Sequence, residues 1–212
     1  MTADAVEHLE LTLDLGPFDG WDDLACAAVC VGGRDTRAAV AAYAGKPTRV
    51  HTLVDVSAGL AKPTVRQIAA VAAAKDGAHG IELMASAWCV MNREFVALRD
   101  DLMSVVIAAR EVSREVGVVV AVRSQWLSGE AGVVEPFCAA VRESGCDGVV
   151  VGGGSPSSTD AYERNVGLIG EHAQGLRVTA TCPADERGEW RRWLERGCDR
   201  VGLMARHAAD AR

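Results

Sequence analysis

The chain has 212 residues, of which 24% are charged and 49% are hydrophobic, and these values are ordinary for a globular protein. Its formal net charge is −7, and no stretch gathers the basic residues, which argues against nucleic acids and anionic membranes as partners. No apolar run is long enough to span a bilayer, and the acidic residues 1–10 lack the apolar core of a signal peptide. We therefore expect a cytoplasmic protein.

Short apolar runs alternate with helical patterns along the chain. The runs are nearly continuous, as in parallel strands that are covered on both faces. The expected strands are Leu9–Leu13, Ala27–Val31, Val50–Val56, Gly80–Ala85, Val118–Arg123, Gly148–Val151, Arg177–Thr181 and Arg200–Met204. Apolar residues at helical spacing predict helices over Pro63–Asp76, Asn92–Val116, Glu130–Ser144, Ser158–Ala173 and Ala184–Arg196. Asn92 is the expected N-cap of its helix.

Three of these helices end in a glycine-containing unit that leads directly into a strand. The units are Asp76-Gly77-Ala78, Ser144-Gly145-Cys146-Asp147 and Arg196-Gly197-Cys198-Asp199. Glycine favours helix C-termini because it adopts left-handed backbone angles without strain. Eight strands that alternate with helices predict a (β/α)8 TIM barrel, with a short first helix and a short C-terminal tail. An open doubly wound sheet is the alternative.

The chain shows no linker, so residues 1–212 are expected to form a single domain with a core of about residues 9–206. Seven cysteines are present, an odd number without any C-x-x-C pair, and no histidine and cysteine cluster has zinc spacing. We therefore expect reduced, mostly buried thiols, no metal site and no cofactor.

Several segments resemble the deoxyribose-phosphate aldolase family in their order and spacing. The match runs from Leu9 to Met204 and rests on Leu9–Leu13, Ala27–Val31, Val50–Val54, Gly59, Lys62–Arg66, Gly77–Met84, Gly145–Asp147 and Gly197–Gly202. The resemblance implies a class I aldolase barrel. In that family a lysine on strand six forms a Schiff base with the substrate, a lysine on strand seven lowers its pKa, and an aspartate on strand four moves protons.

The chain departs from the family at the positions of both lysines. Val150 falls where the resemblance places the Schiff-base lysine, and Thr179 falls at the second lysine. The chain has only three lysines, Lys46, Lys62 and Lys75, and only Lys62 follows a strand near the expected active end. A catalytic lysine needs burial or a cationic neighbour to depress its pKa. Schiff-base chemistry on deoxyribose phosphate is therefore not expected.

Active sites in such barrels lie at the C-terminal ends of the strands. The candidate catalytic residues there are Glu82, Arg123, Glu10 and Asp55. A carboxylate in an apolar strand needs a partner, and Arg123 on the neighbouring strand is the expected partner of Glu82. The pair is either a structural ion pair or a general acid/base held by the arginine.

Further residues are candidates for binding a substrate. They are Cys30, Lys62, Gly152, Gly153, Gly154, Thr179, Thr181, Trp88 and Trp126. The glycine run either cradles an anion or is a flexible loop. The two tryptophans either wall an apolar pocket or pack under the loops. His51 is deep in its strand, and we expect it to be a core histidine.

Two functions of different classes remain open. The leading hypothesis is a diverged aldolase-like enzyme that acts on a small, non-phosphorylated carbonyl metabolite through carboxylate acid/base chemistry. The alternative is an inactive homologue that binds a small molecule or a protein partner. A metal-dependent aldolase is a weaker third option, because His51, Asp55, Glu82 and Cys30 have no recognisable ligand spacing. Homo-oligomers most often have twofold symmetry, so a homodimer is the assembly to test.

Overall fold

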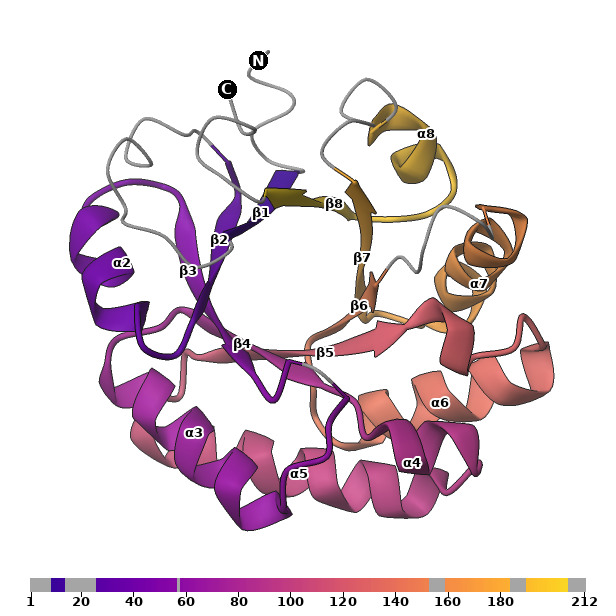
Figure 1. Cartoon of the computed structure of the whole chain (residues 1–212), viewed down its shortest axis with the longest axis horizontal. Coiled ribbons are helices and arrows are strands. Elements are labelled where there is room, and N and C mark those ends of the chain that lie inside the picture. Colours follow the sequence, from indigo (N-terminus) through magenta and orange to yellow (C-terminus); the bar gives the residue numbers. More distant parts are fainter. Residues whose placement is uncertain (1–8, 14–25, 57, 153–158, 184–189, 206–212) are drawn as a thin grey trace.

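The structure is a computed structural model that describes residues 9–13, 26–56, 58–152, 159–183 and 190–205. The strands in these ranges are all parallel and pair in sequence order, and the last pairs with the first, so that the sheet closes into a barrel (Figure 1). They are β1 (Leu9–Leu13), β2 (Ala28–Gly32), β3 (Arg49–Val54), β4 (Gly80–Met84), β5 (Gly117–Arg123), β6 (Gly148–Gly152), β7 (Arg177–Pro183) and β8 (Arg200–Ala205).

Helices surround the barrel on its outer side (Figure 1). They are α2 (Thr36–Ala42), α3 (Pro63–Lys75), α4 (Ala87–Met91), α5 (Phe95–Val112), the 3-10 helix η1 (Ser124–Trp126), α6 (Ala131–Glu143), α7 (Thr159–His172) and α8 (Trp190–Glu195). The main hydrophobic core lies between helices and strands, where outward-facing residues such as Val29, Ile81 and Val120 are fully buried. This arrangement explains why the strands read as continuous apolar runs.

The expected α/β fold with a parallel, curled sheet is confirmed, and the pairing of β8 with β1 excludes an open doubly wound sheet. The expected short first helix and short C-terminal tail fall on residues 14–25 and 206–212, outside the described residues. Within the described ranges, no helix is long and apolar enough to cross a membrane.

The prediction of one helix over Asn92–Val116 was wrong at both ends, because α5 runs from Phe95 to Val112. The chain first forms the short helix α4, which Ser86 caps by accepting a hydrogen bond from the Cys89 amide at 3.4 Å. Asn92 is the C-cap of this helix rather than an N-cap. Arg93 then takes a left-handed conformation with a φ of 60°, so the chain turns before α5 starts. Because the helical spacing of apolar residues continues across this turn, the sequence pattern does not indicate the break.

The glycine units do end helices, as predicted. Gly77, Gly145 and Gly197 have φ values of 89°, 81° and 90°, the left-handed region that glycine adopts without strain. The amide of Ala78 donates to the carbonyl of Ala73 at 3.1 Å, and the amide of Cys198 donates to that of Trp193 at 3.2 Å. These bonds satisfy carbonyls at the ends of α3 and α8 and turn the chain toward the next strand.

The residue two positions after each of these glycines fastens two neighbouring strands together. His79, Asp147 and Asp199 each donate their amide to the carbonyl of a valine on the preceding strand, at 2.8, 2.7 and 2.8 Å respectively. The side chain of each then accepts the amide of the same valine, at 3.0, 2.7 and 2.8 Å. The three valines are Val50, Val118 and Val178.

These paired bonds join β3 to β4, β5 to β6 and β7 to β8 at the ends where the strands begin. They set the register of each pair before the ladder itself starts. At the first joint the acceptor is an imidazole Nδ1, which accepts the Val50 amide only while it carries no proton.

His79 should make folding stability depend on pH. Burial, followed by the charges of Arg49 and His51, lowers the pKa of His79 below its ordinary value of 6.5. A group whose pKa is lower in the folded state than in the unfolded state stabilises the fold at pH values above its ordinary pKa. This stabilisation is lost as the pH falls through the pKa of the folded state. We expect the free energy of unfolding, measured with urea at about pH 7.5 and about pH 5.5, to be smaller at the lower pH.

His79→Asp should remove this contribution, because a carboxylate keeps accepting the Val50 amide across that range. His172→Asn, on the outer helix α7, serves as the matched control and should leave the pH dependence as it is. Equal pH dependence in wild type and His79→Asp would contradict the role of the imidazole.

Candidate functional site

The strand register places inward-facing residues in layers of four, each supplied by alternate strands. Cys30 on β2, Glu82 on β4, Val150 on β6 and Gly202 on β8 form the central layer when the pairings are followed around the barrel. The Cys30 thiol donates to the Glu82 carboxylate, with 3.5 Å between Sγ and Oε2. Two candidate residues that lie 52 positions apart in the sequence therefore meet at the centre of the barrel.

Glu82 is half-buried although it lies on an inward-facing position, whereas Cys30 is fully buried. Small residues occupy several inward positions toward the C-terminal end, among them Gly32, Ala121 and Gly152. A carboxylate in this position can accept a proton from a bound molecule while the thiol orients it. Solvent access to Glu82 is what an open catalytic pocket requires.

Arg123 ends β5 and is exposed, with its guanidinium carbon 5.7 Å from the centre of the Trp126 ring. This cation–π contact holds the arginine at the C-terminal end of the barrel. In the sheet, Glu82 pairs with Val119 on β5, and Arg123 lies four residues beyond Val119 on the same strand, where it pairs with Gly152. The expected contact between Arg123 and Glu82 stays a prediction.

Val150 and Thr179, the two positions that the family resemblance assigns to lysines, are direct neighbours on β6 and β7 and are both buried. Val150 belongs to an apolar cluster inside the barrel with Val119, Ala121 and Met84. All three lysines of the chain are exposed. Lys46 stands over the Tyr43 ring, Lys62 precedes α3, and Lys75 lies in the last turn of α3.

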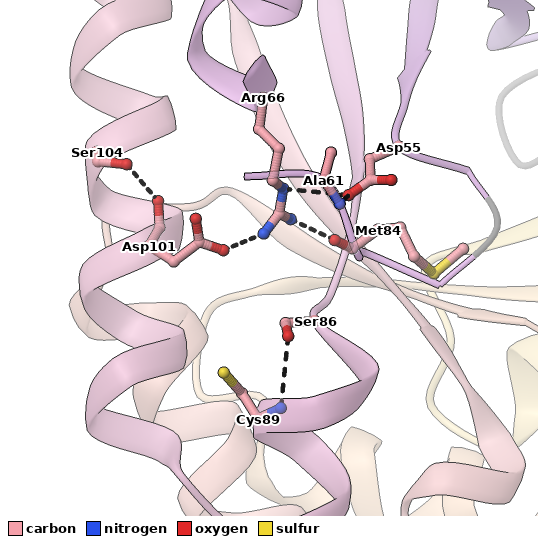
Figure 2. A network of polar contacts seen from close by, with 8 residues as sticks. All are labelled: Asp55, Ala61, Arg66, Met84, Ser86, Cys89, Asp101 and Ser104. Atoms are coloured by element: carbon pink, nitrogen blue, oxygen red, sulfur yellow. Dashed lines mark hydrogen bonds and ion pairs between the residues drawn. The ribbon is translucent and has the colours of Figure 1, made fainter. Parts of the chain in front are cut away.

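Asp55 follows β3 and has a left-handed conformation with a φ of 56°. Its Oδ2 accepts the amide of Ala61 at 3.0 Å and lies 3.7 Å from the Nε of Arg66 (Figure 2). Asp55 therefore closes the loop between β3 and α3 instead of continuing the strand, as the predicted range Val50–Val56 had it. Its proposed catalytic role stays a prediction.

Arg66 is the centre of a buried polar network that the sequence analysis did not identify (Figure 2). Its guanidinium donates to the carboxylate of Asp101 on α5 and to the carbonyl of Met84 at the end of β4. Burial raises the pKa of Asp101, with Arg66 opposing the shift and Asp55 adding to it. The network links α3, α5 and the ends of β3 and β4, and so positions the strand ends beside Glu82.

The two tryptophans occupy different environments. Trp126 packs partly against the main core, while Trp88 is 63% exposed on α4 and does not fill the barrel. Thr181 donates to the carbonyl of Val151 at 3.0 Å, and the Tyr162 hydroxyl from α7 lies 2.7 Å from the carbonyl of Thr181 and 3.0 Å from that of Val151. Thr181 and Tyr162 therefore hold the ends of β6 and β7.

Some predicted residues are described only in part. The backbone of Glu10 pairs with Ala28 and Gly202, which places it next to the central layer. Gly153 and Gly154 lie outside the described residues, while Gly152 ends β6, where an added Cβ would lie 3.3 Å from the Val122 carbonyl. No cluster of three metal-ligating side chains occurs in the part of the chain that is described.

The described cysteines are free thiols, as expected. Burial raises the pKa of Cys138, Cys146 and Cys198 to about 12, so these thiols stay protonated and unreactive at neutral pH. Cys182 is described in its backbone alone, as part of β7. Among the buried thiols, Cys30 is distinguished by its contact with a carboxylate.

Comparison with known proteins supports the fold. No protein-family model and no curated protein matches the chain. Among solved structures, one described as QR15, an aldolase, has a TM-score of 0.77 at 18% identity, over 99% of this chain and 94% of that one. Deoxyribose phosphate aldolase from Aeropyrum pernix has a TM-score of 0.74 at 14% identity, over 98% of this chain and 89% of that one. The predicted resemblance to deoxyribose-phosphate aldolases is thus confirmed at the level of the fold.

The Arg66 network gives a test of what its buried ion pair contributes to folding stability. Arg66→Met should lower the free energy of unfolding by about 3 kcal/mol or more, because it leaves the Asp101 carboxylate buried without its partner. Arg66→Met with Asp101→Leu should recover part of that loss, since an apolar pair replaces the ion pair. Urea unfolding measures both variants.

Arg37→Ala is the matched control for the network, because Arg37 pairs with Asp76 in an ion pair whose arginine is 83% exposed. Its cost should stay under about 1 kcal/mol. Similar losses in Arg37→Ala and Arg66→Met would show that the buried network has no special structural role.

Proposed function

We propose that the chain is a diverged aldolase-like enzyme, built as a single-domain (β/α)8 barrel, that acts in the cytoplasm on a small, non-phosphorylated carbonyl compound. The observation that carries the proposal is the half-buried Glu82 carboxylate, which accepts a hydrogen bond from the Cys30 thiol at the centre of a barrel with the aldolase fold. Neither a metal nor a cofactor is part of the proposal.

Glu82 acts as the general base in this proposal. Its carboxylate takes a proton from the carbon next to the substrate carbonyl, the C–H bond breaks, and the electron pair moves to the carbonyl oxygen as an enolate. The Cys30 thiol keeps one carboxylate oxygen oriented. Arg123, exposed at the end of β5, binds an anionic group of the substrate or the developing enolate charge.

A Schiff-base mechanism is not proposed, because every lysine of the chain is exposed, whereas a catalytic lysine is activated in a buried or cationic environment. Val150 and Thr179 offer no amine at the positions that the family resemblance assigns to the two lysines. The remaining candidates, Glu10 and Asp55, are proposed to assist at the same end of the barrel, with Thr179, Thr181, Trp126 and Gly152–Gly154 lining the substrate site.

A non-catalytic binding protein is the second candidate function. The apolar cluster of Val119, Ala121, Val150 and Met84 favours it, since it occupies the place where the family resemblance predicts the reactive amine. Such a protein would bind a carbonyl or aromatic metabolite over this cluster and release it unchanged.

A ligand and turnover screen decides between the two functions. Native mass spectrometry and thermal shift against aldehydes, ketones, keto acids and aromatic metabolites should identify a ligand, and turnover of that ligand would support the enzyme. Glu82→Gln should lower turnover by about 100-fold or more while the variant stays folded. Glu135→Gln, an exposed change on α6, should have no effect.

Other outcomes of the screen are equally informative. Binding without turnover would favour the second candidate, and full activity in Glu82→Gln would remove the proposed base. Borohydride added in a parallel set should trap no adduct. A covalent adduct that disappears in Lys62→Met would overturn the exclusion of Schiff-base chemistry.

We also propose that the chain forms a homodimer through the surface formed by Leu60, Trp88 and Met91. These side chains are 72%, 63% and 63% exposed, and the amide of Ala87 donates to the carbonyl of Ala58 at 3.0 Å, which brings their two segments together. Exposed apolar patches of this kind mark interaction surfaces.

Sedimentation equilibrium should give twice the chain mass for the wild type and a shift toward monomer for Trp88→Ser. Ile107→Ser, which removes an exposed apolar side chain from α5, should not change the mass. A monomeric wild type would show the dimer to be wrong.

A further inference from the structure

The N-terminal mouth of the barrel, opposite the candidate catalytic end, contains a cavity of about 420 Å³. It opens where β3 to β7 begin and is bordered by the last turn of α5 and the loop after it. Its size is in the range of pockets that hold small metabolites. Four arginines line it: Arg49, Arg110, Arg114 and Arg177.

Most of this positive charge is not neutralised within the protein. Arg110 is paired with Asp147, whose two carboxylate oxygens lie 3.0 and 2.9 Å from its guanidinium. Arg49 donates to the backbone carbonyl of His79 at 3.1 Å, a neutral partner that does not offset the arginine's charge. Arg114 and Arg177 form no ion pair or side-chain hydrogen bond with any described residue. Three cationic side chains thus border one cavity in a chain whose net charge is −7.

Glycines at the strand starts let neighbouring groups pack closely beside the cavity. Gly80 and Gly117 line it, and a Cβ on Gly80 would lie 2.6 Å from the His51 ring. A Cβ on Gly148 would lie 2.5 Å from the carbonyl of Arg177. Side chains at these positions would displace the imidazole and the arginine. The 3% exposed His51 therefore forms a polar floor beneath the arginines.

We propose that this mouth binds a small, multiply charged oxyanion, such as a phosphate ester or a polycarboxylate. Guanidinium groups present N–H donors in a planar fork that matches carboxylate and phosphate oxygens, and several of them around one cavity favour a ligand with more than one charge. Asp147 is occupied by Arg110 and by the amide of Val118, so it does not compete for the other arginines.

Glu115 supplies an internal test, because this exposed carboxylate also lines the cavity, next to Arg114. It opposes an anion in the site, so removing its charge should strengthen binding, whereas removing a neighbouring arginine should weaken it. Damage to the fold would weaken binding in both variants, so opposite effects identify a direct electrostatic role.

The experiment is calorimetric titration with inorganic phosphate, pyrophosphate and citrate, with ionic strength held constant by potassium chloride. We expect the anions of higher charge to bind more tightly than phosphate, and Arg114→Gln and Arg177→Gln to weaken pyrophosphate binding by roughly tenfold each. Glu115→Gln should tighten it by about threefold. Circular dichroism checks the fold of each variant.

Two controls separate this site from other sources of anion binding. Arg164→Gln removes the same charge on α7, beside Gly129 in the loop that follows β5, and should leave the affinity unchanged. Glu135→Gln, which removes an exposed carboxylate on α6, should also leave it unchanged. The site lies at the end of the barrel opposite the candidate catalytic end and does not rest on the proposed enzyme function.

Several results would overturn the proposal. One is that the anions give no heat beyond that of potassium chloride. A second is that the affinity for pyrophosphate is unchanged in both Arg114→Gln and Arg177→Gln. The last is that Arg164→Gln weakens pyrophosphate binding as much as these two changes do. The last would show a response to net charge alone.

Discussion

The register between neighbouring parallel strands is the constraint on which this protein depends. A slip of one residue would exchange every inward-facing side chain with an outward-facing one, so that Glu82 would face the buried core and Ile81 the barrel interior. At three of the joints the protein secures the register with paired hydrogen bonds to Val50, Val118 and Val178. These bonds act at the ends where the strands begin, far from the candidate chemistry.

The same register gives the two ends of the barrel different sets of charged groups. The centre holds a carboxylate and a thiol in contact, and Arg123 ends β5 beyond them. The opposite mouth presents arginines around a glycine-lined cavity. Because both ends open on one stack of inward-facing layers, a charge bound at the mouth would lie beneath His51 and the Glu82 layer. The proposed anion site and the proposed catalytic site are nevertheless built from different residues.

Arg66 illustrates the difference between stability and position. An ion pair buried to this extent gives little net stabilisation, since desolvation of both charges offsets their attraction. Its contacts with Asp101, Asp55 and the Met84 carbonyl instead fix where β3 and β4 end (Figure 2). The left-handed conformation of Asp55 is held by the same contacts. The candidate site therefore depends on a group that does not itself face the barrel interior.

The sequence by itself determined the α/β fold with parallel strands, the approximate strand boundaries and the glycine joints, because each leaves a local signal of apolar runs or helix ends. It also marked Glu82 and Cys30 as candidates, though it did not show that they touch. The break between α4 and α5 was missed because the apolar spacing runs through Arg93.

Only the tertiary structure decided which distant residues meet. Arg66 and Asp101 lie 35 positions apart in the sequence, and Arg114 and Arg177 border one cavity from different elements. In neither pair does the sequence around one residue indicate that it lies near the other. Closure of the barrel brings such residues together through the stagger of eight strands. That stagger is a property of the whole sheet, and no local stretch of sequence encodes it.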